Sequence, residues 1–371
     1  MSLGRLFPYI PFAGALVWNR NPSGGGPVKI HVSFSPDWFA ARMGLDYGED
    51  WHRDPLHRRE SFAAMARALN KEYPELRLGG DPEAIRGGLS QIDGCALAAA
   101  LFGQEILFDP EGWPENRKAP LGDAAAAALR LPDLPGHPLV ADLLRQIDLI
   151  EREWGEVDGE LNYQGVLNTA FRLRGEQLFV DLVQEPERAH HVLGAVCDTM
   201  IALARLVYDR QAKTGVRKDY FVTSNCVVNM ISEEHYRRFV MPYDRKLAGS
   251  FSLFGVHNCG WNVDAYAAAY AGLGALEYLD FGIASDFSRL RALFPATTLT
   301  PILNPEEVIG RGPQEVRDIL RRLRESLGDC RIILGSLDSR TRPEEVNSFF
   351  CEAAALWELP PEELVPQPHC G

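Results

Sequence analysis

The tetrapeptide His-Asn-Cys-Gly at residues 257–260 places an imidazole and a thiol two residues apart, a pair that one zinc ion can bind. Residues 251–256 predict a β-strand, and side chains at positions i and i+2 of a strand point the same way. A turn and a helix over about residues 263–271 follow. His257 and Cys259 are therefore expected at the carboxyl end of a strand, where α/β proteins carry their chemistry. The alternative is a buried cysteine beside a hydrogen-bonded histidine.

Composition narrows the classes of partner. The chain has 371 residues, of which 46% are hydrophobic and 24% charged, so it can form one large core. Its net charge of -13 argues against binding to nucleic acid, which requires a basic face. No run of about 18 apolar residues predicts a membrane span. We expect a small-molecule substrate or a protein partner, and the oligomeric state stays open, with a homodimer among the options.

The cysteines and the N-terminal residues bear on the compartment. Seven cysteines, an odd number and scattered along the chain, indicate a reducing cytoplasm. Residues 6–18 are apolar like a signal peptide, but Pro8 and Pro11 interrupt them and no small-x-small cleavage site follows. We therefore interpret about residues 1–26 as a lead-in segment, with a turn at Gly24–Gly26, and predict a cytoplasmic protein.

The second half of the chain alternates β-branched runs with amphipathic helices, which predicts parallel strands joined by helical crossovers. Five units follow one another. Their strands are expected at 219–223, 251–256, 275–280, 297–303 and 330–334, and their helices begin near Ser232, Val263, Asp286, Pro313 and Pro343.

The first half is less regular. Strands are expected at 29–34 and 160–166, helices at 55–69, 124–129, 139–153 and 186–213, and a loop and a linker at 112–122 and 132–138. Two or three units here, added to the five, give about eight, the number that closes a barrel. We predict one (β/α)8 barrel domain over residues 1–371, with a flexible tail over about 360–371.

The order of several short motifs then resembles the uroporphyrinogen decarboxylase superfamily. This superfamily contains the decarboxylases of haem synthesis and the zinc-dependent methyltransferases that act with corrinoid proteins and coenzyme M. The resemblance implies a (β/α)8 barrel and covers most of the chain. The motifs are Phe102-Gly103, Ile106–Phe108, Gln164-Gly165, Leu173–Gly175, Glu185–Glu187, Ile231–Glu234, Met241–Tyr243, His257–Gly260, Leu303–Glu306 and Thr341–Val346.

Most residues that mark a true decarboxylase of this family are missing. Arg42 is the only arginine near the first loop, Phe171 stands at the tyrosine position, and Ser336 follows Gly335 where a histidine is expected. Asp93 could represent the aspartate that faces the pyrroles, after a shift of one residue. A substrate with eight carboxylates needs many cations. The resemblance is therefore closer to the methyltransferase branch, and decarboxylation is the alternative.

The methyltransferase branch implies a zinc site in which His257 and Cys259 supply two ligands. The third ligand of that branch, a cysteine, falls on Ser336, whose hydroxyl binds zinc poorly. Four other side chains could supply the remaining ligands, and the choice among them stays open. They are Glu277, Asp280, Asp338 and Cys226. Glu277 stands at a position where the related cobalamin-independent methionine synthases use a carboxylate. Cys226 lies at the end of the neighbouring strand and could equally be a packed cysteine.

The resemblance implies transfer of a methyl group between a small methylated substrate or a thiol and a corrinoid protein carrying methylcobalamin. His257, Cys259, Glu277 and Asp280 are the catalytic candidates, and Asp280 or Asn225 could accept the free ring N–H of His257. The substrate-binding candidates are Asn225, Phe171, Tyr163, Trp261 and Asp93. Two further options are another lyase or hydrolase on the same scaffold, and a paralogue that binds a ligand or a corrinoid protein without turnover.

Overall fold

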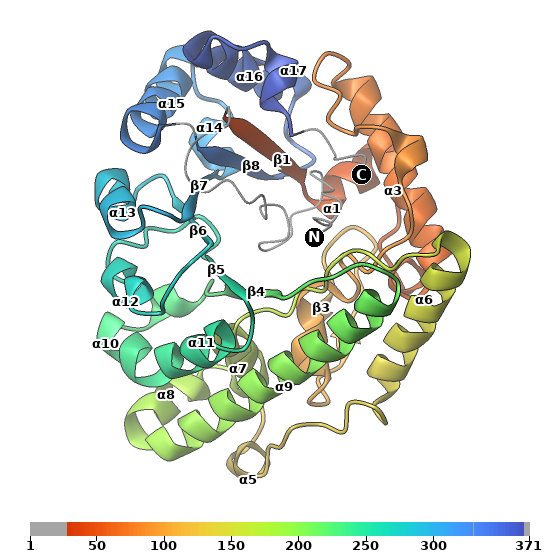
Figure 1. Cartoon of the computed structure of the whole chain (residues 1–371), viewed down its shortest axis with the longest axis vertical. Coiled ribbons are helices and arrows are strands. Elements are labelled where there is room, and N and C mark those ends of the chain that lie inside the picture. The colour runs from red at the N-terminus through yellow and green to blue at the C-terminus, as the bar shows by residue number, and fades with distance from the viewer. Residues whose placement is uncertain (1–27, 329, 367–371) are drawn as a thin grey trace.

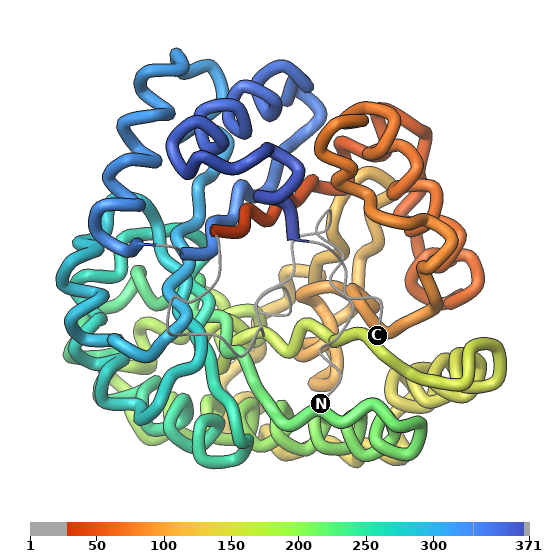
Figure 2. The backbone as a smooth tube through the Cα atoms, turned by 45° about the horizontal axis from the view of Figure 1, so that its top comes forward, coloured from red at the N-terminus to blue at the C-terminus, as the bar shows by residue number. Residues whose placement is uncertain are grey.

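Six parallel strands form a curled sheet at the centre of the protein. The computed structural model describes residues 28–328 and 330–366, so the expected lead-in segment, the Gly24–Gly26 turn and His369-Cys370 lie outside the described residues. The strand order is β1-β8-β7-β6-β5-β4. Figures 1 and 2 show the sheet curling around a central axis with helices on its outside. The strands are β1 (Lys29–Phe34), β4 (Tyr220–Ser224), β5 (Leu253–His257), β6 (Tyr278–Gly282), β7 (Thr298–Leu303) and β8 (Arg331–Leu337).

The five strand-helix units predicted for the second half are confirmed. Helices follow the strands as α10 (Glu233–His235), α11 (Met241–Ala248), α12 (Ala267–Ala271), α13 (Phe287–Leu293), α14 (Pro305–Val308), α15 (Pro313–Leu327) and α16 (Pro343–Trp357). A π-helical turn, Tyr236–Val240, joins α10 to α11. The Ser232 side chain caps α10 by accepting from the His235 amide, and Asp286 caps α13 in the same way. Asn304 and Pro305 end β7 and begin α14.

The first half contributes one strand of the main sheet and most of the long helices. These are α1 (Pro36–Met43), α2 (Glu49–Arg53), α3 (Pro55–Glu72), α4 (Leu97–Ala100), α5 (Asp123–Ala127), α6 (Pro138–Trp154), α7 (Val166–Arg174), α8 (Gln177–Gln184) and α9 (Pro186–Lys213). A small antiparallel pair, β2 (Ile106–Leu107) and β3 (Glu115–Asn116), lies apart from the main sheet. Helix α9 has the length and composition of a membrane span, but it packs against α7, α8 and α11 as a core helix.

The strand expected at 160–166 is wrong. The Asn162 side chain accepts a hydrogen bond from the Gln164 amide at 3.0 Å, and Gln164 adopts φ 61°, so the chain turns where a strand would continue. Two isolated backbone hydrogen bonds join this part of the chain to its neighbours in place of a strand ladder: the Leu89 amide donates to the Asp158 carbonyl and the Ser224 amide to the Gln164 carbonyl. The described residues therefore form a curled half-barrel of six parallel strands. The prediction of a barrel-like α/β fold is confirmed, but the closure of eight strands into a full (β/α)8 barrel is not.

The C-terminal segment differs in part from the expected tail. Helix α17 (Pro361–Leu364) packs against α16, and Leu364 and Val365 are buried. Lys29 at the start of β1 donates to the carbonyl of Glu363 at 2.5 Å. Residues 361–366 are thus part of the packed structure, and residues 367–371 lie outside the part described.

Candidate metal centre

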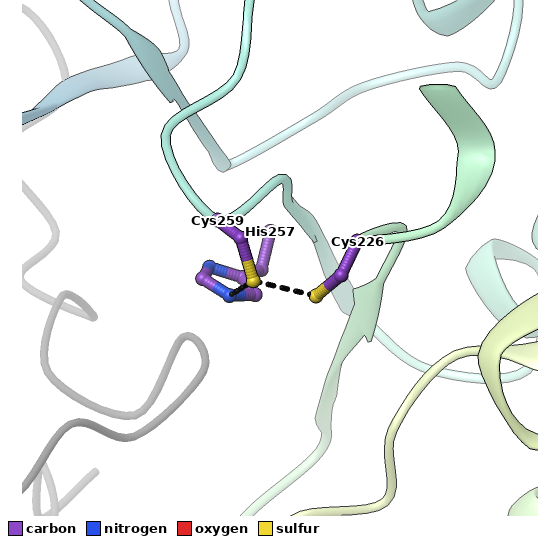
Figure 3. Close-up of side chains that lie close together, drawn as sticks. All are labelled: Cys226, His257 and Cys259. Carbon is purple, nitrogen blue, oxygen red and sulfur yellow. Dashed lines mark hydrogen bonds between the residues drawn. The ribbon is translucent and has the colours of Figure 1, made fainter. Parts of the chain in front are cut away.

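Three metal-binding side chains meet at the carboxyl ends of β4 and β5. The Nε2 atom of His257 lies 3.0 Å from Sγ of Cys259, which in turn lies 2.7 Å from Sγ of Cys226 (Figure 3). The three donor atoms lie within 4.8 Å of one another. A zinc ion bound at about 2.3 Å to sulfur and about 2.0 Å to nitrogen spans such a set. Two thiols and one imidazole are therefore a set of donors that suits zinc.

Strand pairing brings Cys226 to the other two residues. Ser224 at the end of β4 pairs with His257 at the end of β5, and the next amide, of Asn225, donates to the His257 carbonyl at 2.7 Å. The chain then leaves β4 through Cys226, beside the turn that carries Cys259. The Val227 amide donates to Oδ1 of Asn168 on α7, which fixes this exit. The structure thus places the Cys226 sulfur at the same end of the sheet as His257 and Cys259.

The turn after β5 depends on left-handed backbone conformations and on close packing. Cys259 adopts φ 50° and Gly260 φ 77°, so the chain reverses directly after the second sulfur ligand. A Cβ atom added to Gly282 at the end of β6 would lie 1.7 Å from the carbonyl oxygen of Gly260. This contact holds the turn against β6, and only glycine at position 282 permits it.

Asp280 on β6 orients the imidazole. Its Oδ2 atom lies 2.6 Å from Nδ1 of His257 and also accepts from the hydroxyl of Tyr278 at 2.6 Å. Its Oδ1 atom accepts from the backbone amide of Asn258 at 2.6 Å. Tyr270 on α12 donates to Oδ1 of Asn258, so the support extends to the outer helices. When His257 is neutral, this contact holds its proton on Nδ1 and leaves the Nε2 lone pair free to bind a metal ion.

The charges around His257 favour a cation. Burial alone would lower the pKa of His257, but the negative groups Asp280, Cys259 and Cys226 together raise it well above its ordinary value. The two thiols share a hydrogen bond, which lowers the pKa of Cys226 well below its ordinary value and raises that of Cys259. Asp280 and the Cys226 sulfur therefore favour a positive charge at this position.

The other predicted ligands lie elsewhere. Glu277 precedes β6, and its amide bonds the Phe254 carbonyl, so it lies at the amino-terminal end of the strands, opposite the centre. Asp338 accepts from the amide and the guanidinium of Arg340. Ser336 is exposed at the end of β8. Ser336 and Asp338 line a pocket of about 590 Å³ at the carboxyl ends of β7 and β8, with Asn304, Pro305, Glu306, Ile309, Arg340 and Thr341.

Three of the five predicted substrate-binding residues, Asn225, Tyr163 and Phe171, contact other residues of the fold. Asn225 donates to the buried carboxylate of Asp244 at 3.0 Å, behind the strand. Tyr163 stacks on Phe221 in the core, and Phe171 packs on Phe179. The contacts of these three side chains are therefore with residues of the fold, and their role in substrate binding stays a prediction.

Trp261 and Asp93, the other two candidates, also make hydrogen bonds within the fold. Trp261 follows the Cys259 turn, and its carbonyl accepts from Gly282. Asp93 bonds Arg53 at 2.7 Å, and its amide donates to Nδ1 of His52. Burial raises the pKa of Asp93 to about 6, although Arg53 opposes this shift.

Sequence reasoning missed the residues of α7 near the centre. Asn168 accepts from the Val227 amide next to Cys226, and its side chain helps to lower the pKa of the Cys226 thiol. Arg172, one turn later, donates to the sulfur of Cys95 at 2.9 Å. The sequence signal for them was that Asn168 and Arg172 stand four residues apart, and so on one face of the helix that follows the Gln164-Gly165 pair.

Comparison with known proteins now adds to this geometry. The family model of uroporphyrinogen decarboxylase (URO-D) matches residues 93–336. The fold is similar to that of a methyltransferase from Methanosarcina mazei, with a TM-score of 0.63, 15% identity, and coverage of 91% of this chain and 97% of that one. A B12-independent methionine synthase from Shewanella sp. W3-18-1 is less similar, with a TM-score of 0.44, 10% identity, and coverage of 90% and 98%. No curated protein matches the sequence. Since the family model spans most of the chain, including every residue of the centre, this protein belongs to the uroporphyrinogen decarboxylase family.

Proposed function

We propose that this protein is a zinc-dependent methyltransferase that moves a methyl group between a small methylated substrate or thiol and a corrinoid protein. The observation that carries the proposal is the convergence of Cys226, His257 and Cys259, with Asp280 behind the imidazole. Three protein ligands with an open fourth position are the pattern of catalytic zinc sites. The similar fold of a methyltransferase agrees with this choice.

Zinc held by these residues would lower the pKa of a bound substrate thiol, or polarise the oxygen of a methyl ether or alcohol. The protein's own groups then have distinct tasks. His257 and the two cysteines would hold the metal. Asp280 would keep the proton of the imidazole on Nδ1, so that Nε2 could bind the metal. Asn168 positions Cys226 from α7. Cys259, the exposed member of the set, lies on the side from which a substrate can approach.

Decarboxylation of uroporphyrinogen is supported less well, because the cations and the acid near the first strands are engaged. Arg42 bonds Glu72 and the carbonyls of Ser339 and Thr341. Asp93 pairs with Arg53. These contacts leave few groups for a substrate with many carboxylates.

We also propose a cytoplasmic location and a small-molecule substrate. The six cysteines of the described residues are all free thiols, which suits a reducing compartment. Methylcobalamin would be carried by the partner protein, whose methyl group must reach the exposed face of Cys259.

Metal analysis of the purified protein tests the proposal. We expect about one zinc per chain, and less than about a tenth of an equivalent after growth with added zinc would refute it. Cys226→Ser should lose the metal, because it removes one of three protein ligands, whereas Cys351→Ser, which changes an exposed cysteine on α16, should keep it. Retention of zinc by Cys226→Ser would show that the ligand set is wrong.

Activity is tested with free methylcobalamin and small thiols, by following the loss of the methylcobalamin absorbance as its methyl group passes to sulfur. The zinc-loaded wild type should accelerate this reaction, and Cys226→Ser should not. Conversion of uroporphyrinogen to coproporphyrinogen by the wild type would support the decarboxylase alternative instead.

A further inference from the structure

A buried hydrogen bond behind β4 holds the residue that precedes Cys226. The side-chain amide of Asn225 donates to Oδ2 of Asp244 on α11 at 3.0 Å. The backbone amide of Asn225 donates to the His257 carbonyl at 2.7 Å, and its carbonyl accepts from the Val228 amide at 3.1 Å. Asn225 is completely buried. It is therefore held through its side chain, its amide and its carbonyl.

The position of Asn225 sets the position of a sulfur at the metal centre. The paired register of β4 and β5 ends at Ser224 and His257, and Cys226 lies beyond it on the segment that leaves β4 (Figure 3). Its sulfur lies 2.7 Å from that of Cys259. Because metal–ligand distances vary by only about 0.2 Å, a small shift of this segment would remove Cys226 from a metal site.

The carboxylate of Asp244 costs the fold stability. It is completely buried, and burial raises its pKa to about 6, opposed by neutral donors, the side chains of Asn225, Tyr236 and Thr223. Among the described residues it forms no ion pair that would offset this cost. An apolar side chain would be cheaper to bury on the inner face of a helix. Residues that break a packing rule in this way are expected at functional sites.

The structure before α11 fixes the orientation of this carboxylate. Tyr236 begins the π-helical turn 236–240, and its buried hydroxyl donates to the same Oδ2 atom of Asp244 at 2.8 Å. Single π-helical turns occur frequently at functional sites. Helix α11 packs against both β4 and β5, so Asp244 is carried by an element that already contacts the two strands of the centre.

We propose that Asp244 is a positioning residue for the metal centre, which holds Cys226 in place as the third ligand by binding Asn225. The inference rests on the proposed function for the presence of the metal. The arrangement of the two thiols, in contrast, can be measured without metal and without turnover.

Zinc affinity, measured by competition with a chromophoric chelator, is the first test. Asp244→Leu removes the acceptor at similar volume and should weaken zinc binding at least about 10-fold, the usual loss for a residue that supports a metal ligand. Asn225→Ala breaks the same hydrogen bond from the other side and carries the test if Asp244→Leu does not fold. Asp244→Asn keeps an oxygen for the Asn225 amide, so this conservative variant should keep most of the affinity.

Lys218→Met is the control for a loss of stability alone. Lys218 is buried just before β4, at the opposite end of the strand from Cys226, and pairs with Glu160 at 3.1 Å. This variant should be destabilised in urea unfolding and yet keep the zinc affinity of wild type. Unchanged zinc affinity in Asp244→Leu or, if that variant does not fold, in Asn225→Ala would overturn the proposal, and so would an equal loss in Lys218→Met.

The metal-free protein provides a measurement that does not depend on zinc. Phenylarsine oxide condenses with two neighbouring thiols, forming two As–S bonds and releasing water, so its affinity reports how well Cys226 and Cys259 are held together. Asp244→Leu should bind it at least about fivefold more weakly than wild type, because the effective concentration of the second thiol falls. Asp244→Asn should bind it like wild type, and Cys259→Ser gives the level for a single thiol.

The two measurements separate the positioning role from the proposed function. Equal arsenical affinity in wild type and Asp244→Leu would overturn the positioning role, even if wild type contains zinc. Absence of zinc from wild type, together with the expected arsenical affinities, would support the positioning of the thiols and refute the proposed function alone.

Discussion

Replacing Asp280 with Asn should weaken zinc binding while preserving the shape of the site. The carboxylate accepts from three donors, which are Nδ1 of His257, the Tyr278 hydroxyl and the Asn258 amide, each at 2.6 Å. An Asn side chain has one oxygen, so it can accept on one side only. On the other side its amide group must face a donor.

The magnitude follows from these contacts. Loss of a carboxylate behind a metal-binding histidine costs about 10-fold to 100-fold in metal affinity, which corresponds to about 1.4–2.8 kcal/mol. If the Asn oxygen faces His257 and Tyr278, the Asn258 amide loses its acceptor while buried, which costs a further 1–3 kcal/mol, roughly, in folding free energy. We therefore expect weaker zinc binding and a modest loss of stability in the same variant.

Zinc affinity is measured by competition with a chromophoric chelator, and the free energy of unfolding by urea titration of the metal-free protein. Asp338→Asn is the matched control. It neutralises another carboxylate near the barrel mouth, but one whose hydrogen bonds go to Arg340. Its zinc affinity should equal that of wild type.

Two results would refute this reasoning. Zinc affinity unchanged in Asp280→Asn would show that the carboxylate does not orient a metal-binding imidazole. An equal loss in Asp338→Asn would show that the effect is one of overall charge, without a contribution from the contact with His257.

Three further predictions concern the scaffold. Gly282→Ala should destabilise the protein by more than about 3 kcal/mol and lower its zinc content, since the new Cβ would meet backbone at 1.7 Å, whereas Gly194→Ala in α9, with 3.6 Å to its nearest neighbour, should stabilise it by about 0.5–1 kcal/mol. Burial raises the pKa of Asp244 from 3.8 to about 6, so the native state binds the extra proton and the contribution of Asp244 to stability should fall by about 2 kcal/mol as pH rises from about 4 to 6. The pH profiles of urea unfolding for wild type and Asp244→Asn should differ by this amount, and identical profiles would contradict the assignment. Lys218→Met should cost about 3–5 kcal/mol by leaving the buried Glu160 unpaired, with zinc content unchanged; a thermal midpoint like that of wild type would contradict this.

The second half of the fold was predictable because its signals are local. Each strand is a short apolar run, and most of the helices begin at a capping side chain or a proline, as at Ser232 and Pro313. Helix α9 was predicted with its observed bounds, 186–213. The segment 160–166 failed because its apolar character came with an Asn162 turn and a left-handed Gln164, which the hydrophobic pattern does not reveal.

The sequence by itself determined the identity of two donors, His257 and Cys259, because their spacing on a strand is a local property. Tertiary structure decided the third. Cys226 is 31 residues from His257 in the chain, and only the pairing of β4 with β5 brings it to the same mouth, while Glu277 lies at the opposite end of β6. Parallel strands align residues by register, which long-range hydrogen bonding sets and no local pattern encodes. For that reason the sequence predicted the kind of chemistry at the site, whereas the full set of residues that form the site required the tertiary structure.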